Sequence, residues 1–142
     1  MKYLFDTDHL SFLQRRSGTE FVAITARMAG HTAVDFASSV VSFHEQVLGS
    51  HTLINRPRTT TDVIRGYSLF MQVLQSFGTR LVLPFDAAAS ALFSGLQAQK
   101  IRVGTMDLRI AAIALSQGLT LLTRNVRDFG RVPGLITEDW TV

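Results

Sequence analysis

Apolar positions recur along this chain with two different periods, one typical of helices and the other of strands. In segment 61–77 they fall on one face at helical spacing, which predicts a strongly amphipathic helix. Segment Val34–Val41 is rich in β-branched residues and is expected to be a strand. Segment 106–117 is apolar almost all round. A helix of that kind is buried on more than one side, and we expect its own core and a second subunit to cover it.

The turn and cap residues in the rest of the chain divide it into alternating strands and helices. Further helices are expected at 8–16, at 20–29, from Ser42 to 55–57, and from Asp86 to 100. Further strands are expected at 3–5, 81–83 and 120–123, with a short fifth at 135–137. Gly78 and Gly118 are expected to end the helices before them, and the helices 42–55 and 61–77 to form a hairpin beside the sheet. Strands separated by helices pair in parallel through right-handed crossovers. The expected fold is therefore α/β, a three-layer α/β/α sandwich with a central, mainly parallel sheet in a single domain, 1–142.

Composition limits the possible chemistry. The absence of cysteine excludes disulfides, thiolate zinc sites and cysteine nucleophiles, and it suits a reducing cytoplasm. No apolar run is long enough to span a membrane, and residues 1–10 lack the apolar region of a signal peptide, so we expect a cytoplasmic protein. The net charge is +3, and twelve of the 14 basic residues are arginine. This bias is compatible with an RNA or DNA partner, and equally with a basic surface.

Four acidic residues are expected at one edge of the sheet. Asp6 ends the first strand, Glu45 lies one turn past the second, and Asp107 is in the first turn of the apolar helix. Asp128 follows the fourth strand. Four carboxylates in one pocket repel each other unless cations neutralise them, and oxygen-only ligation selects Mg²⁺ or Mn²⁺. The set indicates metal-dependent phosphoryl chemistry.

Each of these acids also has an ordinary explanation. Asp6 can cap the first helix, and Ser42-x-x-Glu45 matches a capping box. Asp107 can complement a helix N-terminus, and Asp128 can hold a turn. Residue by residue these explanations stay open. The convergence of all four positions favours a site.

Smaller roles are assigned to the polar neighbours of the acids. His9 and His44 are expected to be partly exposed and not to bind metal. Thr7 and Ser11 can orient a carboxylate or a bound water. Four arginines near the same edge can hold flanking phosphates or simply be solvated: Arg102, Arg109, Arg124 and Arg127.

The ordered set of motifs resembles the PIN domain and, within it, the VapC-like toxins of type II toxin–antitoxin systems. The motifs are Leu4-Phe5-Asp6-Thr7-Asp8, Ser42-x-x-Glu45, Gly104-x-x-Asp107-x-x-Ile110-Ala111-Ala112 and Thr123-Arg124-Asn125-x-x-Asp128-Phe129. The ending Val132-Pro133-Gly134-Leu135 with Glu138-Asp139-Trp140 is also similar. The match runs over nearly the full length of the chain.

This resemblance implies a PIN fold and a Mg²⁺- or Mn²⁺-dependent endoribonuclease, in which a metal-activated water cleaves RNA phosphodiesters. It also implies a homodimer and a cognate VapB-like antitoxin protein that blocks the site. Asp6 and Asp107 take the positions of the principal metal ligands, and Glu45 and Asp128 those of the other two catalytic acids. Asp8 replaces a frequent asparagine, which leaves its role open.

Two rival functions remain. Asp6-Thr7-Asp8 resembles the start of haloacid-dehalogenase-type phosphatases, with Asp6 as nucleophile, but Leu10 stands where that family has threonine or valine. The other rival is a non-catalytic binding module with a PIN fold. Such a module is expected to have lost acids, whereas this chain retains all four.

Overall fold

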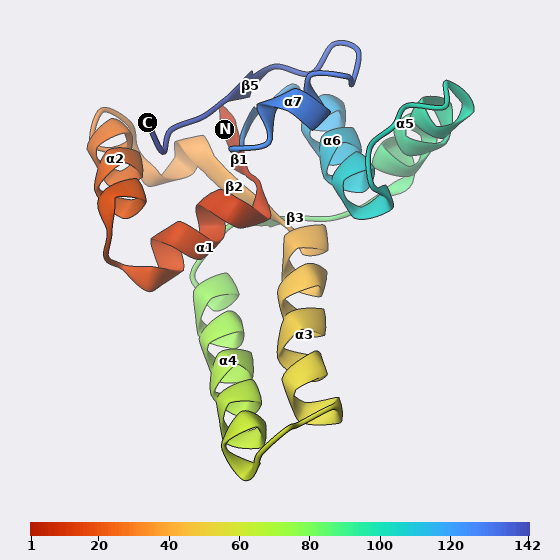
Figure 1. The fold of residues 1–142 in the computed structure, drawn as a ribbon. Coiled ribbons are helices and arrows are strands. Elements are labelled where there is room, and N and C mark those ends of the chain that lie inside the picture. The colour runs from red at the N-terminus through yellow and green to blue at the C-terminus, as the bar shows by residue number, and fades with distance from the viewer.

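The sheet has five strands, all parallel, in the order β3-β2-β1-β4-β5 (Figure 1). A computed structural model describes residues 1–142. The strands are β1 (Tyr3–Phe5), β2 (Phe36–Ser39), β3 (Val82–Leu83), β4 (Thr120–Leu122) and β5 (Thr137–Glu138). Because β1 is central, the residue that follows it lies in the middle of the carboxyl edge.

Helices connect every pair of consecutive strands. They are α1 (Thr7–Arg15), α2 (Thr19–Met28), α3 (Val40–Asn55), α4 (Thr60–Gly78), α5 (Ala87–Ala98), α6 (Thr105–Gln117) and α7 (Val126–Phe129), with a 3₁₀ turn, η1 (Ala33–Asp35), before β2. The expected α/β/α architecture is confirmed. The short α7 was not expected.

Successive residues of the central strands enter two different cores. Leu4 and Leu121 are fully buried in a core shared with α5 and α6, whereas Phe5 and Leu122 pack with α1, α2 and the end of α4. This alternation follows from the two-residue period of a strand. Each such side chain contributes about 1.5–3 kcal/mol when fully buried. Both faces of the sheet are therefore covered by helices.

The hairpin of α3 and α4 projects away from the sheet (Figure 1). The helices approach closely at Gly66, where a Cβ atom would lie 2.6 Å from Ile54 Cγ1. The hairpin and the end of its first helix at Asn55 match the expectation. The contact at Gly66 fixes the distance between the two helices.

The second strand and the start of the helix after it differ from the prediction. Val34–Val41 was expected to be a strand, but β2 covers only Phe36–Ser39 and α3 already begins at Val40. Ser39 is the N-cap residue, and its Oγ accepts a hydrogen bond from Ser42 N at 3.1 Å. The valines belong to the helix because this cap holds its first turn. The proposed capping box of Ser42 and Glu45 is therefore wrong.

Two further boundaries shift by one or two residues. Gly78 is the last residue of α4, and Thr79 takes the cap position in place of the glycine. The fifth strand is Thr137–Glu138, not 135–137. Gly118, by contrast, ends α6 as predicted, in the left-handed conformation at φ 66°.

The apolar helix α6 needs no second subunit to cover it. Its apolar residues Leu108 and Ile110–Ala114 are buried within this one chain, between the sheet and α5. The reasoning that a partner must cover this helix is wrong. The chain has no helix with the length and apolar character needed to span a membrane.

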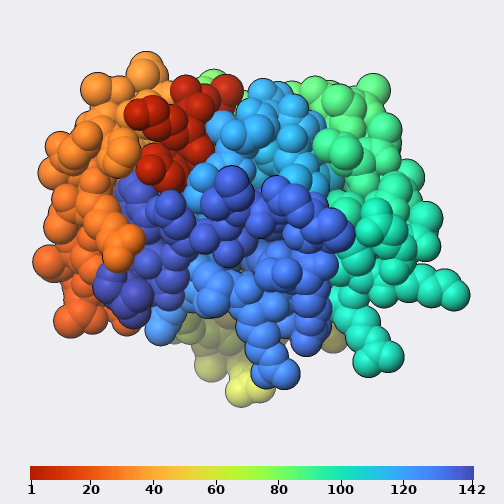
Figure 2. Space-filling view, turned by 90° about the horizontal axis from the view of Figure 1, so that it is seen from above, coloured from red at the N-terminus to blue at the C-terminus, as the bar shows by residue number.

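The C-terminal segment runs across one face of the molecule, from the side of α5 and α6 to α2 (Figure 2). The Trp140 ring packs 4.7 Å from the Tyr3 ring, measured between centroids. Arg27 of α2 donates a hydrogen bond to the carbonyl of Val142. The segment thus joins the first strand to α2.

Candidate active site

Asp6 lies at the middle of the carboxyl edge of the sheet. Its backbone N–H still pairs with Leu122 O of β4, at 2.9 Å, so the residue is held as an extension of β1. Its Oδ1 accepts a hydrogen bond from Thr7 N and its Oδ2 one from Thr123 Oγ1, both at 2.8 Å. Asp6 caps α1, as one ordinary explanation held, and its side chain is only 6% exposed. Capping and a place in the acidic site coincide in this residue.

Glu45 is brought to the site by the second turn of α3. Its Oε1 accepts a hydrogen bond from Thr7 Oγ1 at 2.9 Å, and the Thr7 hydroxyl also lies 2.8 Å from Ser42 Oγ. Thr7 therefore orients a carboxylate, as expected. Ser11 instead accepts a hydrogen bond from Gln46.

Asp107 faces the other acids from the first turn of α6. It is half-buried, and the charges of Asp128 and Asp8 act on it. Its own charge acts on Asp6 and on Glu45. Asp128 accepts a hydrogen bond from Asn125 Nδ2 at 3.1 Å and has Arg131 at 3.5 Å. The four predicted acids thus lie close enough to influence one another's ionisation.

Burial and mutual repulsion raise the pKa of three carboxyl groups of the site. Burial, with the charge of Asp8 next in size, raises the pKa of Asp6 to about 7 against the opposing hydrogen bonds from Thr123 and Thr7. Burial, followed by repulsion from Asp107, raises the pKa of Glu45, although the Thr7 hydrogen bond opposes it. The pKa of Asp107 is raised by burial and then by Asp128 and Asp8. A cation would relieve this repulsion.

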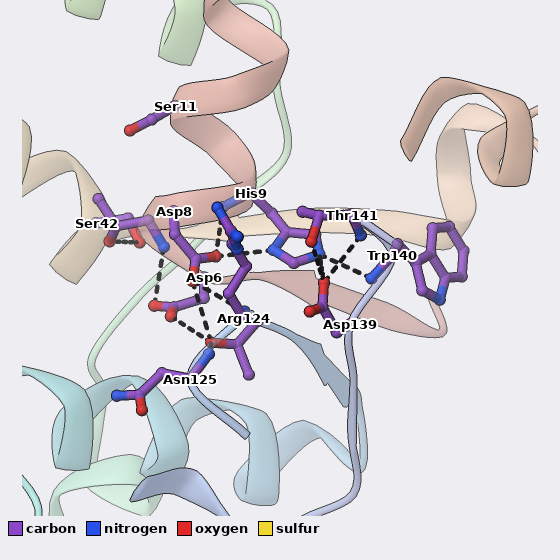
Figure 3. Close-up of polar contacts among 12 residues, drawn as sticks. Asp6, Asp8, His9, Ser11, Ser42, Arg124, Asn125, Asp139, Trp140 and Thr141 are labelled. Carbon is purple, nitrogen blue, oxygen red and sulfur yellow. Dashed lines mark hydrogen bonds and ion pairs between the residues drawn. The ribbon is translucent and has the colours of Figure 1, made fainter. Parts of the chain in front are cut away.

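A chain of hydrogen bonds links the C-terminal segment to Asp8 (Figure 3). Trp140 N donates to His9 Nε2 at 3.1 Å, and His9 Nδ1 lies 2.7 Å from Asp8 Oδ1. The other oxygen of Asp8 accepts a hydrogen bond from Arg124 N at 2.9 Å. Since a neutral imidazole has one donor and one acceptor, these contacts place the proton on Nδ1.

His9 is 0% exposed, so the expectation that it is partly exposed is wrong. It is buried because the Trp140 segment covers it, which the sequence around His9 does not indicate. His44 is exposed.

The arginines near the site differ in their surroundings. The guanidinium of Arg124 lies 5.4 Å above the Phe12 ring, and that of Arg109 lies 5.3 Å above the Phe93 ring. Arg102 and Arg127 are exposed. Arg124 is thus held beside Asp8 by both its backbone and its side chain.

Comparison with known proteins gives one consistent group. No family model matches the chain. It is 42% identical over 76 residues to "tRNA(fMet)-specific endonuclease VapC" of Shigella flexneri, a match that covers 50% of this chain and 58% of that protein. It is 28% identical over 145 residues to "Ribonuclease VapC2" of Haemophilus influenzae, a match that covers 99% of this chain and 98% of the relative. The crystal structure of DNA-bound VapBC from Salmonella typhimurium contains a similar chain, with a TM-score of 0.74 and 26% identity over 99% of this chain and 98% of that one. The chain is therefore similar to VapC proteins in sequence and in fold.

In this VapC-type chain, Thr123 is a site residue to which sequence reasoning gave no role. Its fully buried hydroxyl donates to Asp6 Oδ2 and accepts a hydrogen bond from Asn125 N at 2.9 Å. One signal could have identified it. It follows β4 as Asp6 follows β1, and these two strands are neighbours in a parallel sheet.

The donor set of this VapC-type site suits a hard cation. The acids offer oxygen atoms only, which is the ligand type that Mg²⁺ and Mn²⁺ prefer. As the side chains stand, no three acidic or histidine residues form a group that could hold a metal ion. A cation held here would keep water ligands beside one or two carboxylates, as Mg²⁺ usually does.

Proposed function

We propose that this chain is an endoribonuclease that hydrolyses RNA phosphodiester bonds with a divalent cation held by Asp6, Glu45, Asp107 and Asp128. The observation that carries the proposal is the charge interaction of Asp107 with each of the other three acids, the most distant of which, Asp6, is 101 residues away in the sequence. Like charges are gathered in this way where a cation is to be bound. The relatives named VapC act as ribonucleases according to their names, which supports the same activity.

The cation is Mg²⁺ or Mn²⁺ in this proposal. When bound, it makes a coordinated water more acidic and neutralises charge on the phosphate. The side chains of this protein do the rest. Thr7 and Thr123 each hold one carboxylate in orientation, and burial of Asp6 strengthens its interaction with a cation. His9 is not placed to act as a base, since it is fully buried behind Asp8.

The phosphatase alternative is disfavoured by the residues around Asp6 and by the relatives. Leu10 stands where that family has threonine or valine, and the proteins to which the chain is similar are named as nucleases. A covalent phosphoenzyme on Asp6 after incubation with a phosphomonoester would restore that alternative.

The decisive experiment is cleavage of total RNA by the purified chain with a chelator, with Mg²⁺ and with Mn²⁺. We expect cleavage only with metal, and none from Asp6→Asn. Asp86→Asn is the matched control, because Asp86 caps α5 away from the site and asparagine also caps helices. Cleavage by Asp6→Asn at the wild-type rate would overturn the site.

We further propose that a VapB-like antitoxin protein inhibits the enzyme. Four apolar side chains of α4, each more than half exposed, recur at intervals of three and four residues: Ile64, Tyr67, Met71 and Leu74. This spacing forms one stripe along the helix, which an amphipathic partner segment can cover. An arginine of the antitoxin would pair with the carboxylates, because its planar fork stays charged when desolvated.

Self-association and location complete the proposal. We propose a homodimer that buries part of the apolar surface of the helices, to be tested by sedimentation at micromolar concentration. A monomer under those conditions would contradict it. We propose that residues 1–142 act as one folding unit in the cytoplasm, which the absence of cysteine suits.

A further inference from the structure

Arg80 occupies an unusual place for an arginine. It is half-buried, yet it forms no ion pair with an acidic side chain. Its Nε donates to Ser76 Oγ at 3.3 Å, and its guanidinium lies 5.9 Å from the Phe5 ring. Burial lowers the pKa of this guanidinium from its usual value, and the neighbouring Arg16 lowers it further. The charged guanidinium of Arg80 is thus partly buried without an acidic partner in this chain, which costs free energy.

Arg16 lies beside Arg80 in a backbone conformation that few arginines adopt. It ends α1 with φ at 55°, in the left-handed region where side chains other than glycine are strained. Both arginines line one cavity of about 560 Å³. The other lining residues are mostly amides and hydroxyls, with no acid among them. Two unpaired cations among hydrogen-bond donors form a site for an anion.

A groove beside this cavity runs along α1. The groove, of about 390 Å³, lies between α1 and the α3/α4 hairpin and shares Gln14 and Gln72 with the cavity. Its other end is lined by Ser11, one turn after Thr7, whose hydroxyl contacts Glu45. The nine helical steps from Thr7 to Arg16 span about 14 Å. A single strand that leaves the acidic site along α1 would therefore reach the two arginines after a short stretch.

We infer that the groove binds the single-stranded RNA that flanks the cleaved bond, and that Arg16 and Arg80 together hold one of its phosphates. This inference rests on the proposed ribonuclease function. The chemistry favours RNA because the glutamine amides of the lining can pair with base edges and the two cations suit a phosphate.

The test measures binding of a fluorescent single-stranded RNA, without metal, as a function of salt. Arg16→Gln and Arg80→Gln should each weaken binding about tenfold, the loss of one charge-assisted contact. Each should also reduce the slope of log affinity against log salt by about 0.7, the value for one phosphate contact of a single strand. Arg80→Lys keeps the charge and should retain the slope. Arg58→Gln, exposed before α4 at the far end of the hairpin, is the matched control and should change neither quantity.

Thermal melting provides a second readout with inorganic phosphate as the probe. Phosphate should raise the melting temperature of the wild type more than chloride at equal ionic strength, and Arg16→Gln should abolish the difference. Arg16 is exposed, so this variant keeps the fold even if Arg80→Gln does not. Wild-type RNA affinity and slope in both glutamine variants would overturn the inference. If phosphate still raises the melting temperature in that case, the cavity binds an anionic group of a protein partner and not a phosphate of RNA. If the wild-type chain cleaves RNA and the arginine variants bind RNA normally, only this inference is wrong. If the wild-type chain cleaves no RNA, the proposed function is wrong.

Discussion

The Thr7 hydroxyl donates a hydrogen bond to the carboxylate of Glu45 at 2.9 Å, and this contact ties the start of α1 to α3. Glu45→Gln keeps an oxygen that accepts this bond but removes the charge. We expect a loss of RNA cleavage of roughly 100-fold with a nearly unchanged melting temperature. Glu20→Gln in α2 is the matched control and should cleave normally. Full activity in Glu45→Gln would return Glu45 to a purely structural role.

Asp107 repels the other acids of the site, so its charge should lower the stability of the metal-free protein. Asp107→Asn should abolish cleavage and raise the melting temperature of the metal-free protein, because its four interactions with Asp6, Asp8, Glu45 and Asp128 disappear. Added Mn²⁺ should stabilise the wild type more than the variant. A metal-free variant that melts below the wild type would contradict this account of the site.

The buried carboxyl of Asp6 should make stability depend on pH in the metal-free protein. Folding raises its pKa from 3.8 to about 7, so the folded state keeps a proton that the unfolded chain releases over this range. The stabilisation from this group is complete below pH 3.8 and is lost as the pH rises to about 7, on the order of 4 kcal/mol in all. Asp6→Asn should remove this part of the pH dependence. Urea unfolding of both proteins at pH 5 and pH 8 measures it, and equal pH dependence in the two would show that Asp6 does not titrate in this range.

His9 links Trp140 N–H to a carboxylate oxygen of Asp8. His9→Leu leaves Trp140 N–H without its hydrogen bond, while Asp8 Oδ1 still accepts one from the backbone N–H of residue 9, so we expect a loss of about 1–3 kcal/mol in the free energy of unfolding. His51→Leu on the exposed face of α3 should cost almost nothing. If the two variants are equally stable, the link between the C-terminal segment and Asp8 is unimportant for stability.

The exposed apolar stripe of α4 should contribute to antitoxin binding and not to RNA cleavage. Met71→Glu with Leu74→Glu should weaken antitoxin binding at least tenfold, since a charge replaces apolar area at each position. RNA cleavage by the free chain should remain. Substitution of Gln75, on the same helix, by glutamate is the control for added charge. Unchanged antitoxin affinity in the double variant would move the partner to another surface.

Local patterns predicted most of the fold because they act over short distances. The 3.6-residue period of α4, the glycine after α6 and the aspartate before α5 each fix an element through its own neighbours. The parallel order then placed Asp6 and Asp128 at one edge. The start of α3 was missed because Val40 and Val41 favour strands, while the Ser39 cap decides for the helix.

Contacts between distant segments were beyond the reach of these patterns. The burial of His9 depends on Trp140, which is 131 residues away. The strand β5 has only two residues, which is too short a pattern to predict its bounds. The cavity of Arg16 and Arg80 likewise forms between the ends of two helices that meet only in the folded molecule. The spacing of apolar residues in the sequence gives no information on such contacts between distant segments.

The hydrogen bond from Thr123 to Asp6 joins residues 117 positions apart. Closing a loop of that length carries an entropy cost that is recovered only when β1 and β4 pair. A folding intermediate in which the first helices have formed but β4 has not docked would therefore hold Asp6 without its partner and without the acids of α6 and α7 beside it. The proposed nuclease site is therefore complete only after β4 has paired with β1.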